Sequence, residues 1–184
     1  MIEVRWHGRG GQGVWTASNL LAMAALKEGK YVQSFPTFGP ERMGAPIMAF
    51  TRISDEPIEL HCSVYEPDIV VVLDPTLLGP GIIEGLKPNG FIIANFPREL
   101  DELIKVLGIS KGQYKVYAVN ATEVAVKILK RGITNTAMLG ALVKATGIVK
   151  LESVFDVIKE RFSGVIAERN IEVVKVTYES TKGG

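Results

Sequence analysis

The sequence predicts an α/β fold: a three-layer α/β/α sandwich around a mixed, mostly parallel sheet with one inserted antiparallel hairpin. Two apolar runs without alternation, residues 69–73 and 90–94, are typical of strands that helices cover on both faces. Segments with helical periodicity alternate with such strands along the chain. The 184 residues, of which 47% are hydrophobic, suffice for one sizeable core, so we expect a single domain spanning residues 1–184.

The N-terminal part predicts a strand, a helix and then antiparallel structure. Four glycines follow the first strand, and Gly29 is expected to end the helix after them. Pro36 ends the next strand, and a loop rich in Gly and Pro follows. Residues 54–57 have the composition of a four-residue hairpin turn. The expected elements are strand 2–6, helix 14–28, strand 31–35 and hairpin strands 47–53 and 58–61.

The remaining residues predict strands that lead into helices. Asp74, Asn95 and Asn120 end three strands, the last of which covers 115–119. The simplest role for Asp74 and Asn120 is to cap helices that begin at Pro75 and Ala121. Helix 136–146 is apolar on nearly all sides, so it lies either in the centre of the core or at a subunit interface. The other expected helices are 100–107, 124–129 with Gly132 at its end, 151–162 and 165–178.

Composition argues against several classes of function. The 21 basic and 20 acidic residues give a formal charge of +1 without a basic cluster, so we expect no nucleic-acid partner. We also expect a cytoplasmic protein without a membrane partner, because no apolar run approaches the ~20 residues of a spanning helix and the first residues do not resemble a signal peptide. The single Cys62 cannot provide a disulfide or hold an iron–sulfur cluster alone. His7 and His61 do not have metal-site spacing, and we assign no metal ligand and no catalytic residue.

The segment Gly8-Arg9-Gly10-Gly11-Gln12-Gly13 satisfies the dinucleotide fingerprint G-x-G-x-x-G between a strand and a helix. A dinucleotide site also needs an acidic residue at the end of the second strand, and residues 32–36 contain none. NAD is therefore disfavoured. Main-chain amides of the loop and the start of the following helix still form an anion site, for which a pyrophosphate is the natural ligand. The alternative is that the glycines only permit a tight turn.

Charged and polar side chains extend this predicted anion site. Arg9 and the side-chain amide of Gln12 are candidates for contacts within the loop. Arg42, in the second loop rich in Gly and Pro, is a candidate for a second phosphate, although an ion pair with Glu41 is an equal alternative. Asn135 either lines the same cleft or caps the helix that follows it, and we favour capping.

Three segments together carry a resemblance: "HGRGGQGVWTASNLLA", "FPTFGPERMGAPIMAFTRISDEPI" and "NTAMLGALVKATG". They resemble the gamma subunits of 2-oxoacid:ferredoxin oxidoreductases, in particular of pyruvate:ferredoxin oxidoreductase, over almost the whole chain. The resemblance implies an enzyme that converts pyruvate and coenzyme A to acetyl-CoA and CO2 and reduces ferredoxin. It also implies alpha, beta and delta subunits as partners, with thiamine diphosphate between alpha and beta and [4Fe-4S] clusters on other chains.

For this chain, the resemblance implies a role in binding coenzyme A and in assembly, without activity of its own. Coenzyme A carries a pyrophosphate and a 3′-phosphate, and it suits a loop without the acidic residue of a dinucleotide site. We therefore assign the pyrophosphate to Gly10, Gly11, Gln12 and Gly13 with Arg9 nearby, and a phosphate to Arg42. Three alternatives remain: a gamma subunit for branched-chain 2-oxoacids such as 2-oxoisovalerate, a free-standing dinucleotide-binding oxidoreductase, and a non-catalytic scaffold.

Overall fold

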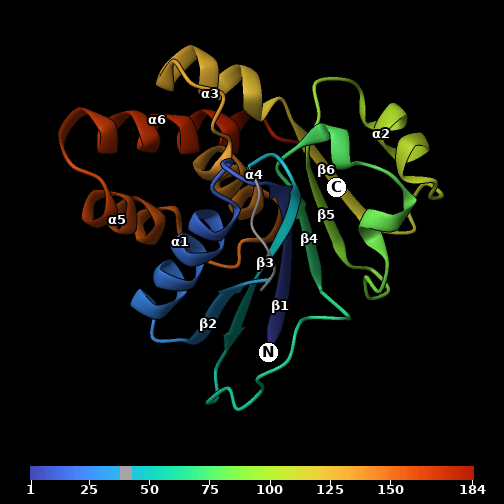
Figure 1. Ribbon diagram of the computed structural model, residues 1–184, viewed down its shortest axis with the longest axis horizontal. Coiled ribbons are helices and arrows are strands. Elements are labelled where there is room, and N and C mark those ends of the chain that lie inside the picture. Colours follow the sequence, from blue (N-terminus) through green and yellow to red (C-terminus); the bar gives the residue numbers. More distant parts are fainter. Residues whose placement is uncertain (38–42) are drawn as a thin grey trace.

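Figure 1 shows the computed structural model, which describes residues 1–37 and 43–184. One mixed sheet has the strand order β2-β3-β1-β4-β5-β6-β7. Strands β1, β4, β5 and β6 are parallel neighbours, whereas β3 runs antiparallel to β1 and β2, and β7 runs antiparallel to β6. The strands are β1 (Ile2–Arg9), β2 (Tyr31–Pro36), β3 (Pro46–Ser54), β4 (Ile69–Val72), β5 (Phe91–Asn95), β6 (Lys115–Val119) and β7 (Lys182–Gly183).

Helices cover both faces of the sheet, which confirms the predicted three-layer sandwich (Figure 1). Helices α1 and α4 pack on one face, and α5 and α6 lie outside them. Helix α2 and the short 3₁₀ turns η1 and η2 lie on the other face. The helical segments are α1 (Val14–Lys27), η1 (Pro75–Leu77), η2 (Pro80–Ile83), α2 (Leu100–Leu107), α3 (Ala121–Leu129), α4 (Asn135–Thr146), α5 (Leu151–Arg161) and α6 (Gly164–Ser180).

Strand β4 explains why the apolar runs do not alternate. Val71 faces the core shared with α1 and α4, whereas Val70 and Val72 face the core beneath α2. Successive side chains of a strand point to opposite faces, and here both faces are buried. A strand in this position therefore needs apolar residues at every position, as the sequence predicts.

Helix α4 lies in the centre of the larger core, which settles the alternative left open for residues 136–146. Its residues 135–143 are all buried. A Cβ atom at Gly140 would lie 2.2 Å from Thr177 Oγ1 and 2.4 Å from the carbonyl oxygen of Val174, both in α6. The absence of a side chain at Gly140 thus allows α4 and α6 to approach each other closely.

The predicted hairpin is wrong in its second strand. Residues 47–53 belong to β3, but residues 58–61 form no strand, because β3 already pairs with β2 on one edge and with β1 on the other. Side chains hold the following segment instead. Gln33 donates from Nε2 to the carbonyl oxygen of Leu60 at 2.9 Å, and Arg52 donates from Nη2 to that of Cys62 at 2.8 Å.

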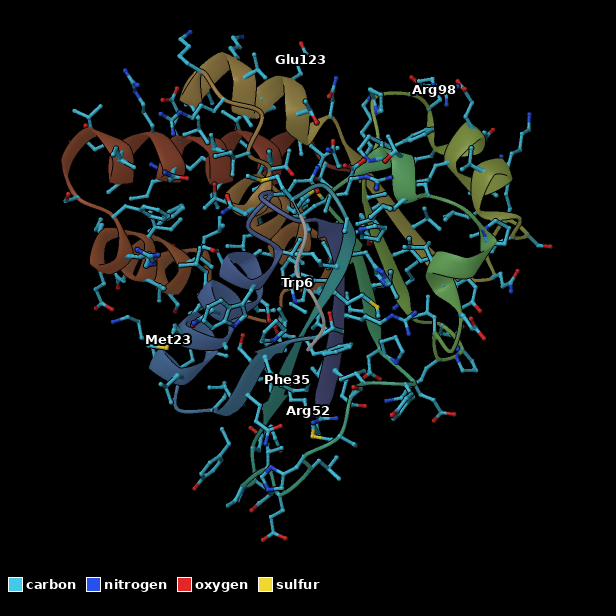
Figure 2. The ribbon with its side chains drawn as sticks, in the orientation of Figure 1. Trp6, Met23, Phe35, Arg52, Arg98 and Glu123 are labelled. Carbon is cyan, nitrogen blue, oxygen red and sulfur yellow. The ribbon has the colours of Figure 1, made fainter. Side chains whose placement is uncertain are left out.

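Arg52 is buried on the face of β3 that points away from α1. Its Nε donates to Glu3 Oε1 at 2.8 Å, and its guanidinium lies 5.4 Å from the centre of the Phe35 ring. Figure 2 shows Arg52 and Phe35 near each other at the lower end of the sheet. The antiparallel edge of the sheet therefore has a polar, ion-paired face where the parallel strands have an apolar one.

Three smaller expectations also need correction. Pro75 begins only the short 3₁₀ turn η1, because Gly79 and Pro80 follow within one turn and start a new one. Helix α3 ends at Leu129 and not at Gly132, because Lys130 already adopts a left-handed conformation with φ 58°. Strand β7 is not predicted from sequence.

Within residues 1–37 and 43–184, no helix has the length and apolar character needed to cross a membrane.

Candidate functional site

The glycine loop connects the carboxyl end of β1 to the start of α1 (Figure 1). The neighbours of β1 differ in direction: β3 is antiparallel and β4 is parallel. The end of β4 therefore lies beside the loop, while the chain segment that enters β3 lies on its other side, where Arg9 is opposite Pro46. Ligands of open α/β sheets bind at such carboxyl ends.

The shape of the loop requires its glycines. Gly11 and Gly13 have φ angles of 91° and 74°, which disfavour residues with a side chain. A Cβ atom at Gly8 would lie 2.5 Å from Val14 Cγ2, and one at Gly13 would lie 2.6 Å from Asn135 Nδ2. The alternative that the glycines permit a tight turn therefore has structural support, and any ligand site must be made by the groups that the turn leaves open.

Two of the four amides assigned to the pyrophosphate already donate hydrogen bonds within the protein. The amide of Gly10 donates to the carbonyl oxygen of Ala45 at 2.9 Å, and that of Gln12 donates to the carbonyl oxygen of Arg9 at 3.1 Å. In the described part of the chain, the amides of Gly11 and Gly13 have no partner. Helix α1 has neither a side-chain cap nor an acidic residue in its first turn. The open donors thus lie closer to α1 than the sequence suggested.

The side chain of Gln12 is also engaged within the protein. Its Oε1 accepts from the amide of Arg9 at 2.7 Å, and its Nε2 donates to Asp74 Oδ2 at 2.6 Å. The Arg9 guanidinium donates to Thr76 Oγ1 and to the carbonyl oxygen of Gly44, and about a third of its side chain is exposed. Arg9 thus presents positive charge at the surface of the loop, whereas Gln12 stabilises the loop from within.

Asp74 is an acidic residue that contacts this loop through Gln12 and Arg9. It caps η1 by accepting from the amide of Thr76 at 2.9 Å, as predicted, and it lies 3.5 Å from Arg9 Nε. Burial alone would raise the pKa of Asp74, but hydrogen bonds from Thr76 and Gln12 and the charge of Arg9 together lower it. The carboxylate is therefore ionised. Sequence reasoning missed its contact with Gln12, which follows from the parallel pairing of β1 with β4.

The predicted capping role of Asn135 is wrong, because Asn135 is already the first residue of α4. Thr134 is the residue before the first turn of α4, but Asn135 Oδ1 accepts from the amide of Thr136 at 2.8 Å. Its Nδ2 lies against Gly13, so the start of α4 adjoins the start of α1. Asn135 also lines a cavity of about 390 Å³ whose other lining residues include Arg131 and Arg169. The described residues that line this cavity include none of the glycine loop, so a role of Asn135 in the predicted cleft stays a prediction.

Arg42, Asn120 and Asn95 are the other positions singled out in the sequence. Arg42 and Glu41 lie outside the described residues, so both roles considered for Arg42 remain predictions. Asn120 caps α3 by accepting from the amide of Glu123 at 3.2 Å, as predicted. Asn95 donates to the carbonyl oxygen of Leu73 and to Thr122 Oγ1, which is a structural role. Among residues 1–37 and 43–184, no cluster of three or more His, Cys, Asp or Glu residues has the arrangement of a metal site.

Comparison with known proteins gives one consistent family. Residues 3–180 match the family described as "Pyruvate ferredoxin/flavodoxin oxidoreductase". The chain is 53% identical to the "Pyruvate/ketoisovalerate oxidoreductases common subunit gamma" of Thermococcus kodakarensis, over 98% of this chain and 97% of that protein. The crystal structure of pyruvate oxidoreductase subunit PORC from Thermotoga maritima matches 100% of this chain and 98% of that one, with 44% identity and a TM-score of 0.90.

A more distant structure shares the fold. It is a 2-oxoglutarate:ferredoxin oxidoreductase from Magnetococcus marinus, solved with 2-oxoglutarate, coenzyme A and succinyl-CoA bound. The match covers 97% of this chain and 31% of that chain, with 22% identity and a TM-score of 0.74. The sandwich described above is therefore also found as one part of a longer polypeptide.

Proposed function

The chain belongs to the pyruvate ferredoxin/flavodoxin oxidoreductase family, and we propose that it is the gamma subunit of a pyruvate synthase. That enzyme oxidatively decarboxylates pyruvate with coenzyme A to acetyl-CoA and CO2 and reduces ferredoxin. Thiamine diphosphate supplies the decarboxylation chemistry when bound, and we assign it to the alpha and beta subunits. The [4Fe-4S] clusters belong to other chains, since this one has a single cysteine.

Within that enzyme, the chain binds coenzyme A at the junction of the glycine loop and α1. The observation that carries this proposal is the uncapped start of α1, where no described residue accepts from the amides of Gly11 and Gly13 and Arg9 is partly exposed. A helix N-terminus with open amides attracts a diphosphate through hydrogen bonds and through the helix dipole. The dinucleotide alternative lacks its acidic partner, because β2 ends in Phe35 and Pro36.

The residues of this chain bind and orient coenzyme A and do not react with it. Gly11, Gly13 and Arg9 contact the pyrophosphate, and Arg42 contacts a further phosphate. Arg131 and Arg169 line the cavity beside Asn135, whose Nδ2 lies against Gly13. Anchoring the nucleotide end in this way directs the thiol end toward the neighbouring subunits, where the acyl group is transferred.

The replacement Arg42→Ala in the reconstituted complex tests this proposal. We expect the KM for coenzyme A to rise roughly tenfold, because a charge-assisted contact to phosphate is lost. The KM for pyruvate should not change. Arg98→Ala is the matched control, since Arg98 is an exposed arginine paired with Glu102 near the start of α2 (Figure 2). An unchanged KM for coenzyme A in the Arg42 variant would contradict the assignment of Arg42.

A second candidate function is a gamma subunit that also serves branched-chain 2-oxoacids. The name of the T. kodakarensis relative joins pyruvate and ketoisovalerate in one common subunit gamma. A chain that binds only the cosubstrate has no need to distinguish the two oxoacids. Reconstitution of this chain with thiamine-binding subunits of each specificity should then give the same KM for coenzyme A in both complexes.

A further inference from the structure

Four side chains join the glycine loop to the segment after β4, and we call them the clasp: Arg9, Gln12, Asp74 and Thr76. Gln12 Nε2 donates to Asp74 Oδ2 at 2.6 Å, and Gln12 Oε1 accepts from the amide of Arg9 at 2.7 Å. Thr76 Oγ1 donates to Asp74 Oδ1 at 2.6 Å and accepts from Arg9 Nε and Nη2 at 3.1 and 2.9 Å. The hydrogen bonds thus form a closed ring.

Asp74 determines the direction of these hydrogen bonds. An ionised carboxylate only accepts, so it orients the Gln12 amide with the nitrogen toward Asp74 and the oxygen toward Arg9. It also directs the Thr76 hydroxyl proton toward itself, which leaves the hydroxyl oxygen free to accept from Arg9. Arg9 also contacts both groups, through its amide and its guanidinium, but Asp74 is the acceptor to which both Gln12 and Thr76 donate. The orientation of the Gln12 amide and of the Thr76 hydroxyl therefore depends on this carboxylate, which acts through them on the amide and the guanidinium of Arg9.

We propose that Asp74 is a positioning residue for coenzyme A, which acts through Gln12 and Thr76 and does not touch the cosubstrate. This inference rests on the proposed function. Gln12 lies beneath the loop, with its Oε1 only 3.1 Å from the Cβ position of Gly8. The clasp holds the loop in the conformation in which the amides of Gly11 and Gly13 have no acceptor among the described residues, so binding does not require the loop to be ordered first.

Positioning by Asp74 and simple electrostatic repulsion predict opposite changes in the affinity for coenzyme A. A carboxylate near a diphosphate site repels the ligand, so removal of its charge alone would strengthen the binding of coenzyme A. If Asp74 instead positions the loop, Asp74→Asn weakens binding. The oxygen of the new amide would stay at the Oδ1 position, where it accepts from the amide of Thr76, so the new amide nitrogen would face Gln12 Nε2. Two donors cannot form a hydrogen bond with each other. Gln12 must then turn, and the amide of Arg9 loses its acceptor.

The test uses three variants of the chain in the reconstituted complex: Asp74→Asn, Gln12→Glu and the double variant. We expect each single variant to raise the KM for coenzyme A roughly tenfold, because a hydrogen bond to a charged group is lost or replaced by carboxylate repulsion. The KM for pyruvate and the kcat at saturating coenzyme A should change little. Circular dichroism checks that each variant has folded.

The double variant exchanges the two functional groups and restores the ring. The amide introduced at position 74 would donate to the carboxylate introduced at position 12, whose second oxygen would accept from the amide of Arg9. The oxygen of the new amide would still accept from Thr76. The total charge is unchanged. We therefore expect the KM for coenzyme A to return close to the unmodified value, which general destabilisation by two substitutions would not produce.

Two results would overturn the inference. One is an unchanged or lower KM for coenzyme A in Asp74→Asn. The other is a double variant whose KM for coenzyme A is no lower than that of the single variant with the higher KM. The Arg42→Ala variant shows whether such a result contradicts only the role of Asp74 or also the proposed function. If Arg42→Ala raises the KM for coenzyme A and Asp74→Asn does not, only the role of Asp74 is wrong. If isothermal titration of the complex shows no binding of coenzyme A that depends on either residue, the proposed function is wrong.

Discussion

His7 is a buried histidine on the same face of β1 as Arg5 and Arg9. Its Nε2 accepts a hydrogen bond from Arg5 Nε at 3.0 Å, so the proton of the neutral ring lies on Nδ1. Burial, and secondarily the charge of Arg5, lower the pKa of His7 to about 3. His7 is therefore neutral near pH 7 and serves as a hydrogen-bond acceptor for Arg5.

The variant His7→Gln should remove a pH-dependent part of the stability. Below pH ~6.5 the unfolded chain protonates His7, whereas the folded chain keeps it neutral down to about pH 3. The folded state therefore loses stability as the pH falls through this window. Between pH 7 and pH 5, the unmodified chain should lose about 2 kcal/mol more than the variant. Chemical denaturation at both pH values measures this difference, and equal losses would contradict the account of His7.

The roles of single residues in the loop were only partly predictable from sequence. The spacing of the glycines predicts a loop between a strand and a helix, and the structure has that loop there, whereas its role as an anion site stays a prediction. The glycine spacing does not indicate that Gln12 faces Asp74, because this contact depends on which strand lies beside β1. The same holds for Asn135, whose contact with Gly13 depends on how α4 packs.

At the level of elements, the local residue pattern predicts which segments form strands or helices better than it predicts which strands pair. The apolar runs that became β4 and β5, and the stripe that became α2, are visible in sequence because burial on defined faces imposes them. The sequence does not show that β3 lies between β1 and β2. The residue pattern of β3 would be the same whether it paired only with β2, which precedes it in the chain, or also with β1. The two-residue strand β7 is too short to have any pattern.

The contact between α4 and α6 gives a prediction at this scale. Gly140→Ala places a methyl group within 2.4 Å of the backbone of α6, so the two helices must separate. We expect the free energy of unfolding to fall by about 1 to 3 kcal/mol, although alanine favours a helix by ~1 kcal/mol over glycine. Denaturant titration measures the change.

Gly132→Ala is the control for this variant, because the nearest atom to its new methyl group is Val126 Cγ2 at 3.9 Å. We expect this control to change stability by less than about 0.5 kcal/mol. If Gly140→Ala were equally neutral, the close approach of α4 to α6 would have no energetic weight.

At the scale of the whole molecule, one sheet supports two cores. Trp6 and Val71 belong to the core beneath α1 and α4, while Val70 and Ile92 belong to the core beneath α2. Alternate residues of β4 and β5 contribute to both cores, so neither core can lose its packing without exposing the other face of the same strands. This shared sheet supports the prediction that residues 1–184 form one domain.

The prediction is that the chain unfolds in a single cooperative transition. The variant Trp15→Phe removes an exposed tryptophan and leaves the fully buried Trp6 as the fluorescent reporter of β1. Far-ultraviolet circular dichroism reports all helices, including α2 on the opposite face. Because β1 and α2 are linked through the shared sheet, the two signals should follow the same denaturant curve with one midpoint. A separate, earlier transition seen only by circular dichroism would mean that α2 and its core unfold independently, and that residues 1–184 contain two folding units.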